Sequence, residues 1–398
     1  MRREDLIELL RHRLVRLPKP HEAHYGVIPI TPDRVLSVVG LENHHANALK
    51  AFGRAEQLLS RRVDTFSATR MLVRREAVAS SSIEGTNSTL DELLLQEAGG
   101  EAERTETKIV RDYALTISNL MPIASAKKFD VFDIDFIAKA HHALMIRDPD
   151  YRDPPGELRT TTVWIGGGDI AYSTYNPLPS ENVAALLNDY CNWVKDDEAR
   201  QRSSPISRLA AGHAYFEAIH PFRDGNGRVG RLLMTLAMAA EDLPAIYLSP
   251  YIEKEKNAYY EGLKAAQKQL DISKLTKFFC DAVIATVNEL EQTLRTVDEI
   301  AEGWKKRIKA REDSHVYPAI NLLRDMPVLN AGTLAERLKI SSQAANTVLR
   351  ALVDNDIVRE RTGYKRNRIF AADQILSVFN RPFGEEPILE ATESGMAP

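Results

Sequence analysis

The sequence lacks most of the features that mark secreted, metal-binding or membrane proteins. Its 398 residues include 2 cysteines, Cys191 and Cys280, with no CxxC pattern, which argues against a disulfide framework or a zinc site and favours a reducing compartment. The longest apolar run, LLMTLAMAA at 232–240, is about half a membrane span and precedes Glu-Asp. The opening MRREDLIELL has no apolar segment of the signal-peptide type. We therefore expect a cytoplasmic protein with no membrane partner.

A large charge imbalance is also missing. The formal net charge is −4, so no global cationic field attracts nucleic acid or a membrane surface. Hydrophobic residues make up 44% and charged residues 27%, the profile of a soluble globular chain. The length predicts two or three domains.

Helical patterns dominate what is present, and the expected fold class is mainly α. We expect a helical N-terminal region at 1–104, a helical core at 105–295 and a linker helix at 296–312. A smaller unit follows at 313–375, and an acidic flexible tail at 376–398. One stretch interrupts the core: Thr160 to Ile165 are mostly β-branched or aromatic and Gly166–Asp169 reads as a turn, which predicts a short β-hairpin.

The unit at 313–375 reads as helix, turn, helix, and then two short strands around Gly363. Ser341 or Ser342 can cap its second helix. The pattern resembles a winged helix-turn-helix whose wing carries Arg359, Arg361, Lys365, Arg366 and Arg368. DNA binding is one interpretation. A basic hairpin that is simply solvated, or a module for protein contacts, is the other.

The segment HPFRDGNGRVGR, at 220–231, concentrates polarity between two apolar helices. Ser204 and Pro205 predict the start of the first helix, and Pro221 ends it, so His220 lies at its last turn. The second helix begins directly after the loop, and its free N–H groups point back into the same space.

Such a place suits an anion. Gly225 and Gly227 let the backbone approach a phosphate, and Arg228 and Arg231 lie one turn apart on the new helix. Asp224 beside a polyphosphate requires a bridging cation, which suggests Mg²⁺. The alternatives are a plain DGNG turn, or a GxGxxG dinucleotide fingerprint, which we reject because a helix rather than a strand precedes it.

The twelve residues match HxFx(D/E)GNGRxxR at every specified position, and the chain therefore resembles the Fic family. That resemblance implies a mainly helical enzyme that moves AMP from ATP to a Ser, Thr or Tyr hydroxyl of a target protein, or of itself, and releases pyrophosphate. It also implies a homodimer. His220 would deprotonate the hydroxyl, and Asp224 would hold Mg²⁺ on the phosphates.

The resemblance assigns further residues. The nucleotide-binding residues would be Asp224, Gly225, Asn226, Gly227, Arg228, Gly230, Arg231, Tyr259 and Tyr260, with Asn226 and the loop amides on the α-phosphate. The family's flap, which aligns a target segment through main-chain pairing, would be Val163, Trp164, Ile165 and Gly166. Gln267 stands where relatives often carry an asparagine that faces adenine, so the base preference stays open.

A second motif, SSSIEGTNSTLDE at 80–92, ends a long helical pattern. Gly85 is a natural terminator, and Thr89 with Glu92 predicts a capping box for the next helix. Glu84 then lies at a helix C-terminus, the end that disfavours anions. Either this carboxylate is solvated, or it has a cationic partner.

Ser80, Glu84 and Gly85 resemble the (S/T)xxxE(G/N) inhibitory motif of Fic proteins. There the glutamate pairs with the second motif arginine, here Arg231, and blocks the place of the γ-phosphate. Two other functions remain as alternatives. One is a Fic transferase that moves another nucleotide or removes AMP, and the other is a DNA-binding regulator that uses the C-terminal unit. Family kinases carry lysine where Gly227 stands, which disfavours phosphorylation.

Overall fold

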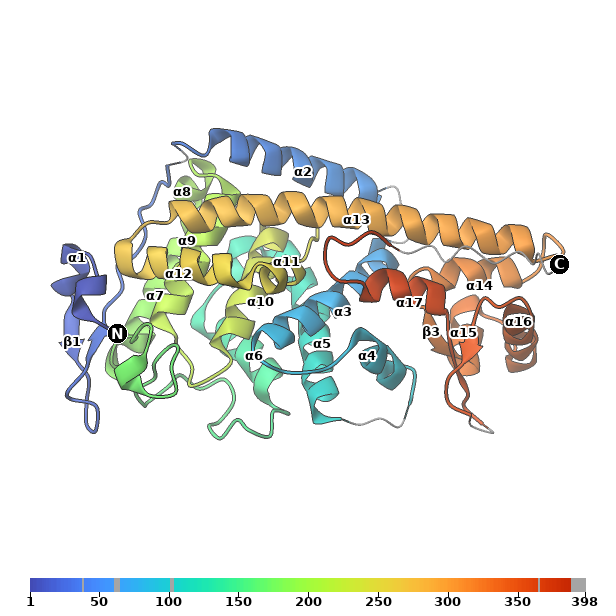
Figure 1. Cartoon of the computed structure of the whole chain (residues 1–398), viewed down its shortest axis with the longest axis horizontal. Helices are drawn as coiled ribbons and strands as arrows, with labels where there is room; N and C mark the ends of the chain where they lie inside the picture. Colours follow the sequence, from blue (N-terminus) through green and yellow to red (C-terminus); the bar gives the residue numbers. More distant parts are fainter. Residues whose placement is uncertain (38, 61–64, 101–103, 364–365, 388–398) are drawn as a thin grey trace, which may run out of the picture.

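The computed structural model describes residues 1–37, 39–60, 65–100, 104–363 and 366–387. It confirms a mainly α chain with two small sheets (Figure 1). Short elements come first: a 3₁₀ turn at Arg3–Asp5, α1 (Glu8–Arg11), β1 (Leu14–Arg16) and β2 (Tyr25–Val27). Helices α2 (Glu42–Ser60), α3 (Thr65–Ile83) and α4 (Leu90–Glu97) follow. No helix among the described residues could cross a membrane.

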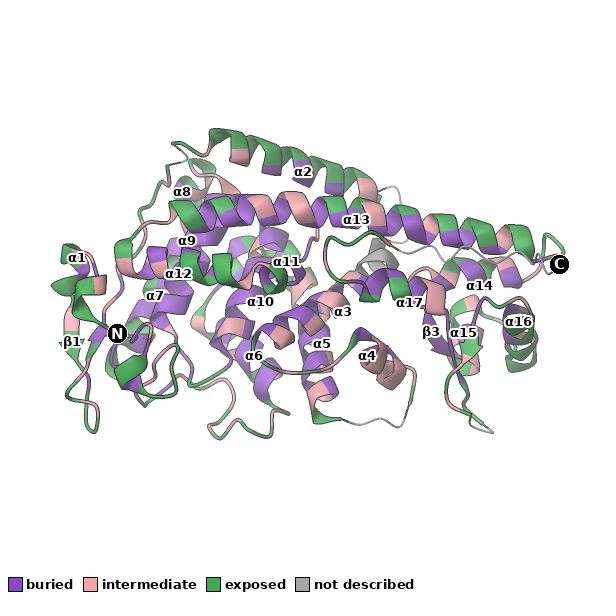
Figure 2. Cartoon of the chain, viewed as in Figure 1, coloured by how far each residue is buried: buried purple, intermediate pink, exposed green. Residues whose placement is uncertain are grey.

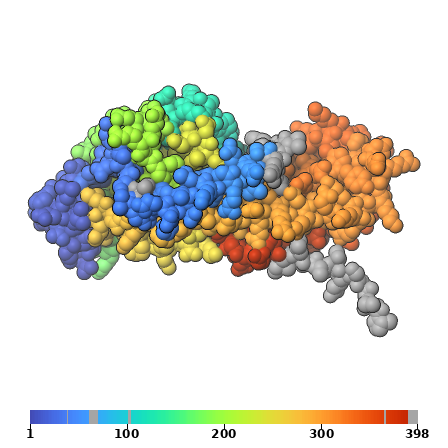
Figure 3. Space-filling model, turned by 90° about the horizontal axis from the view of Figure 1, so that it is seen from above, coloured from blue at the N-terminus to red at the C-terminus, as the bar shows by residue number. Residues whose placement is uncertain are grey.

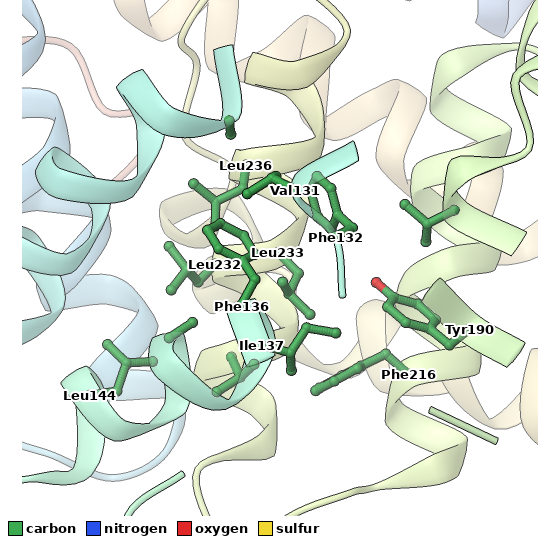
Figure 4. Close-up of a cluster of buried hydrophobic side chains, with 14 of the residues drawn as sticks. Val131, Phe132, Phe136, Ile137, Leu144, Tyr190, Phe216, Leu232, Leu233 and Leu236 are labelled. Atoms are coloured by element: carbon green, nitrogen blue, oxygen red, sulfur yellow. The ribbon is translucent and has the colours of Figure 1, made fainter. Parts of the chain in front are cut away.

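The centre of the molecule is the helix pair α9 (Pro205–Ile219) and α10 (Asn226–Ala240). Every residue of α9 after Pro205 is buried (Figure 2), because several other helices pack against it. Between α4 and this pair lie α5 (Thr105–Lys127), a 3₁₀ turn at Lys128–Val131, α6 (Ile134–Met145), 3₁₀ turns at Ile170–Tyr172 and Ser180–Asn182, α7 (Val183–Lys195) and α8 (Asp197–Gln201). Figure 4 shows how Phe132 and Phe136 pack against Leu232 and Leu236 in this core.

Helices α11 (Ser249–Lys254), α12 (Lys256–Gln269) and α13 (Ser273–Arg307) follow the central pair. The predicted boundary between core and linker helix, at 295/296, falls inside α13, which continues without a break. Its buried stripe runs from Leu290 and Leu294 across the boundary to Val297 and Trp304, so one amphipathic helix serves both parts. Helix α2 lies along α13 (Figure 3).

The expected β-hairpin of the flap is wrong in its extent. The segment forms a single antiparallel bridge, Ile165 to Tyr175, and then a 3₁₀ turn at Ile170–Tyr172 that Asp169 caps. Gly166 and Gly167 have φ of +71° and +75°, and a Cβ on Gly166 would lie 2.5 Å from Thr174 Oγ1. The chain turns too tightly there for a longer ladder.

The C-terminal unit contains α14 (Val316–Leu323), β3 (Val328–Asn330), α15 (Ala331–Leu338), α16 (Ser342–Asp354), β4 (Arg359–Glu360) and β5 (Ile369–Ala371). The strand order is β3-β5-β4, antiparallel throughout. Ser341 caps α16, as one of the two predicted candidates. This order of elements agrees with the sequence pattern, and assignment to the winged-helix class stays a prediction. Lys365 of the predicted wing lies outside the described residues.

The predicted flexible tail is wrong over its first part. Residues after 372 form α17 (Asp373–Asn380), which buries Ile375, Leu376, Val378 and Phe379, and the following Arg381 is buried beside Glu289. The acidic composition of the whole segment concealed this short amphipathic stripe. Residues 388–398 lie outside the described part.

The core of the C-terminal unit is continuous with the N-terminal helices. Met71 of α3 and Leu90 and Leu94 of α4 share one buried cluster with Trp304 of α13 and Ile369 of β5. Consequently α3 and α4, whose junction carries Glu84, are packed between the central helices and the C-terminal unit (Figure 1).

Candidate active site

His220 occupies the position where α9 stops. Ser204 caps the helix and Pro205 is at its first turn, as predicted, and His220 ends it in the left-handed region with φ 49°. Its backbone N–H still bonds Phe216 O at 2.9 Å, so the residue is fixed to the helix end. The imidazole is 18% exposed, which leaves one edge of the ring accessible to a reactant.

The loop after His220 is shaped by its own side chains. Asn226 Oδ1 accepts from Phe222 N at 2.9 Å, and Asn226 Nδ2 donates to Phe222 O at 2.8 Å. Asp224 Oδ1 accepts from Gly225 N at 2.6 Å, and Gly225 has φ +77°. The Asn226 side chain therefore closes the loop in this structure, and its binding of a phosphate stays a prediction.

His141, which sequence reasoning missed, supports this loop from below. Its ring stacks on Phe222 with centroids 3.8 Å apart, and Nε2 lies 3.1 Å from Asp224 O. Nδ1 accepts from Gly156 N at 2.9 Å, which requires a neutral ring. Burial lowers the pKa of His141 to about 4. The sequence shows a histidine on the buried face of α6, but this position alone does not reveal that the ring contacts the loop at Phe222 and Asp224.

Arg159 is the second residue that sequence reasoning missed. Its guanidinium is buried and donates to four backbone carbonyls, those of Thr161, Leu178, Ile219 and His220, at 2.8–3.3 Å. Burial lowers the pKa of Arg159 to about 10. One side chain thus ties both ends of the flap segment to the last turn of α9. No spacing rule in the sequence reveals such a contact, because all four partners are main-chain atoms.

Arg231 lies on the second turn of α10 and meets the end of α3. Its Nη2 donates to Glu84 Oε1 and to Ser80 O, both at 2.8 Å, and its Nε donates to Ser80 Oγ at 2.8 Å. The side chain of Arg231 is 1% exposed and that of Glu84 is 37% exposed. Burial alone would lower the pKa of Arg231, but the Glu84 charge, the tyrosines at 259 and 113 and the hydrogen bond to Glu84 together raise that pKa. The structure therefore brings Glu84 to Arg231, the pairing that the resemblance implied, and places Ser80 of the same motif on Arg231 as well.

Glu84 also lies against the first turn of α10. A Cβ on Gly227 would be 2.2 Å from Glu84 Oε1 and 3.1 Å from Arg231 Nη1, so only glycine leaves room for this carboxylate. We call Gly227 together with the Arg231 guanidinium the anion site. Helix α3 ends at Gly85 with φ +90°, and the Thr89–Glu92 capping box starts α4, both as predicted.

Four residues that the resemblance assigns to the nucleotide make other contacts in this structure or lie away from the loop, and their assignment stays a prediction. Arg228 is buried and paired with Asp148 at 3.1 Å, although its Nε and Nη1 have no hydrogen-bond partner among the described residues. Tyr259 is 1% exposed, with its hydroxyl 2.6 Å from His213 Nε2, so it lies beneath the site; Tyr260 is at the surface. Gly230 is buried behind the loop. His213 itself is buried in the core.

The flap residues keep free main-chain groups. Ile165 bonds Tyr175 through its N–H at 2.8 Å, whereas the backbones of Val163, Trp164 and Gly166 make no hydrogen bond within the described part of the chain. The Trp164 ring contacts His21 edge-on at 5.7 Å. This edge can therefore pair with an extended segment of another chain.

A metal would find one carboxylate here. Among the described residues no group of three or more His, Cys, Asp or Glu side chains could hold an ion. Asp224 is exposed and has one carboxylate oxygen on its own loop. This fits Mg²⁺ of the kind that is held by one carboxylate and by substrate phosphates, and does not fit an all-protein cage.

Fold and site together define a helical protein with a histidine, a glycine loop and an anion site at two helix ends. The Fic/DOC family model matches residues 131–238, and the Fic/DOC N-terminal model matches residues 43–118. Residues 43–118 and 131–238 of the chain therefore match the two models of the Fic/DOC family.

Known proteins support this family assignment. The chain is 31% identical over 193 residues to protein adenylyltransferase fic-1 of Caenorhabditis elegans, covering 46% of this chain and 35% of that protein. It thus spans about a third of that curated relative. A Fic family protein from Desulfovibrio desulfuricans has a similar fold, with TM-score 0.54, 21% identity and coverage of 86% and 98%. A Fic domain protein from Bacteroides thetaiotaomicron aligns with TM-score 0.51 at 18% identity, covering 61% and 95%.

Proposed function

We propose that this protein transfers AMP from ATP to a Ser, Thr or Tyr hydroxyl of a target protein, and to itself, with release of pyrophosphate. The observation that carries the proposal is the anion site: a carboxylate of the chain itself, that of Glu84, lies on Arg231 against the first turn of α10. A site that attracts one anion within the chain suits a phosphate equally. The names of the curated relatives support AMP as the transferred group.

The residues of the chain divide the chemistry between them. His220 accepts the proton of the target hydroxyl, whose oxygen then attacks the α-phosphorus. The backbone N–H groups around Gly225 and Gly227 face the charge that grows on the phosphate oxygens, and Arg231 holds the remaining phosphates. Asp224 holds Mg²⁺, which neutralises phosphate charge. The free main-chain edge of Val163 and Trp164 aligns the target segment.

In this proposal, Glu84 inhibits the enzyme in its resting state. Its carboxylate occupies the anion site, so a γ-phosphate cannot reach Arg231 while the contact persists. The Glu84 carboxylate and a γ-phosphate are both negative, and two such charges about 4 Å apart in a partly buried site repel each other by several kcal/mol. Removing the carboxylate should therefore release the enzyme.

Labelled nucleotide tests the proposed transfer. Incubation with α-³²P-ATP and Mg²⁺ should label the protein, while γ-³²P-ATP should leave no label, because pyrophosphate departs. The His220→Ala variant should lose about 10²–10⁴-fold in rate while keeping its melting temperature. Label from γ-³²P-ATP would identify a kinase, and loss of label from pre-labelled target would identify AMP removal.

For the C-terminal unit the proposal is more limited. Arg361 pairs with Asp91 and Asp373, and Arg359 with Asp373, so two arginines of the predicted wing are already engaged. We infer that any DNA contact would use the exposed polar face of α16. Both cysteines are free and buried, which supports the proposed cytoplasmic location. The homodimer stays a prediction from the resemblance.

A further inference from the structure

Beside His220 lies a buried carboxylate, that of Glu217, which has no role in the chemistry proposed above. Glu217 is three residues earlier on α9, and its Oε2 is 3.6 Å from His220 Nδ1. Its side chain is 8% exposed. Because His220 ends the helix in a left-handed conformation, its ring folds back toward the preceding turn. The ring nitrogen that turns to Glu217 is Nδ1, which leaves Nε2 for a reactant.

No other side chain satisfies this carboxylate. Glu217 Oε1, His220 Nδ1 and His213 Nδ1 are all buried and have no hydrogen-bond partner among the described residues. Burial lowers the pKa of His213 to about 4, so that ring is neutral near pH 7. Burial alone would raise the pKa of Glu217, yet its contact with His220 and the charge of Arg231 lower it. The carboxylate is thus charged, and among the described residues its ion-pair partner is His220.

The loop motif itself makes room for Glu217. A Cβ on Gly230 would lie 2.5 Å from Glu217 Oε1 and 3.0 Å from His213 Cε1. Any side chain at 230 would displace the carboxylate. The glycine that the sequence assigned to nucleotide binding therefore has a steric reason to be there, one turn into α10 and behind the imidazole.

We propose that Glu217 is a positioning residue that holds His220 as the Nδ1–H tautomer and directs Nε2 at the reacting hydroxyl. The inference rests on the proposed function. During transfer the hydroxyl O–H bond breaks and its proton goes to Nε2. The new O–P bond forms as the bond to pyrophosphate breaks, and the pyrophosphate leaves with the electron pair. The proton on Nε2 then passes to solvent, and Glu217 stabilises the imidazolium meanwhile.

The first test needs no enzymatic activity. The ¹⁵N NMR spectrum of ¹⁵N-histidine-labelled full-length protein reports the tautomer of each ring, and His220→Asn identifies the His220 signals among the 10 histidines. We expect the Nδ1–H form in the wild type and a mixture in Glu217→Gln. A wild-type His220 in the Nε2–H form would overturn the proposal without any Glu217 variant.

Kinetics form the second test, in a Glu84→Gly background to remove the proposed inhibition. Glu217→Gln should lower kcat by roughly 10²–10⁴-fold and leave the KM for ATP unchanged, because the wrong tautomer disables the base alone. Glu217→Asp, which keeps the charge, should recover part of the loss. The matched control is Glu289→Gln, a buried carboxylate paired with Arg75 and Arg381, which should keep kcat and the His220 spectrum.

The outcomes separate the two proposals. If the Glu84→Gly background transfers no AMP, the proposed function fails, and the NMR result still decides the role of Glu217. If transfer occurs but Glu217→Gln retains kcat and the wild-type tautomer, the positioning role is wrong. A kcat loss matched by Glu289→Gln would indicate general destabilisation and would also overturn it.

Discussion

Removing the carboxylate of Glu84 is the most informative single change in this protein. Arg231 donates one hydrogen bond to Glu84 Oε1 at 2.8 Å, and two more go to Ser80, which the change leaves intact. Gly85 already ends α3, so Glu84→Gly should disturb little of the fold. We expect the variant to transfer AMP faster than the wild type.

The structure sets the size of the effect. A hydrogen bond to a charged group contributes about 1.5–3 kcal/mol, and solvent weakens exposed pairs. Since the Glu84 side chain is 37% exposed, the lower part of that range applies, about 2 kcal/mol. That energy keeps about 97% of the molecules closed and corresponds to a rise of roughly 30-fold on release.

The assay is the initial rate of α-³²P label incorporation at saturating ATP and Mg²⁺. Glu97→Gln is the matched control, because it weakens the ion pairs of Arg70 and Arg74 on α3 while leaving the anion site occupied. The control should stay near the wild-type rate. Adding Arg231→Ala to Glu84→Gly should abolish the gain, since the arginine is then missing from the phosphates.

Two results would refute this reasoning. Equal rates for Glu84→Gly and wild type, with both proteins folded, would mean that Glu84 does not limit access to the anion site. An equal rise in Glu97→Gln would mean that loosening of α3, and not the vacated anion site, activates the enzyme.

Three further predictions follow from buried groups. Arg159→Met should lower the free energy of unfolding by about 3 kcal/mol, because it leaves buried carbonyls unsatisfied, and should lower kcat, measured by denaturation and by labelling. Burial lowers the pKa of His141 and His213 to about 4, so below pH 6.5 the unfolded chain binds more protons than the folded chain. The free energy of unfolding, measured by urea titration, should therefore be at its full value above pH 6.5. Toward pH 4 it should fall by up to about 3 kcal/mol per histidine. Arg381→Ala should cost about 3–5 kcal/mol by leaving Glu289 buried with one partner fewer.

Each of these has a result that contradicts it. An Arg159→Met variant with wild-type kcat would show that the flap and the end of α9 are not coupled. Urea midpoints that are the same at pH 7 and pH 5 would exclude a neutral buried histidine as a source of acid sensitivity. An unchanged melting temperature in Arg381→Ala would show that α17 is not anchored through this ion pair.

The local sequence determined several of the helix ends. Ser204 and Pro205, Gly85 and the Thr89–Glu92 box all act within a few residues, so their patterns predicted helix starts and stops correctly. The motif at 220–231 likewise determines the shape of its own loop. The side chains of Asn226 and Asp224 close the loop by bonding backbone N–H groups at most four residues away. The pairing of Glu84 with Arg231 was predicted from the resemblance to a family. It was confirmed by the hydrogen bond between these two residues, which are 147 positions apart in the sequence.

The tertiary structure decided which residues face the site and which support it. Tyr259 and Gly230 were assigned to the nucleotide, yet in the structure they contact His213 and Glu217 of another helix. Arg159 and His141 act on backbone atoms, which carry no sequence signature. Burial and partner choice depend on how distant helices pack, and periodicity within one helix reports only that a face is buried, not what lies against it.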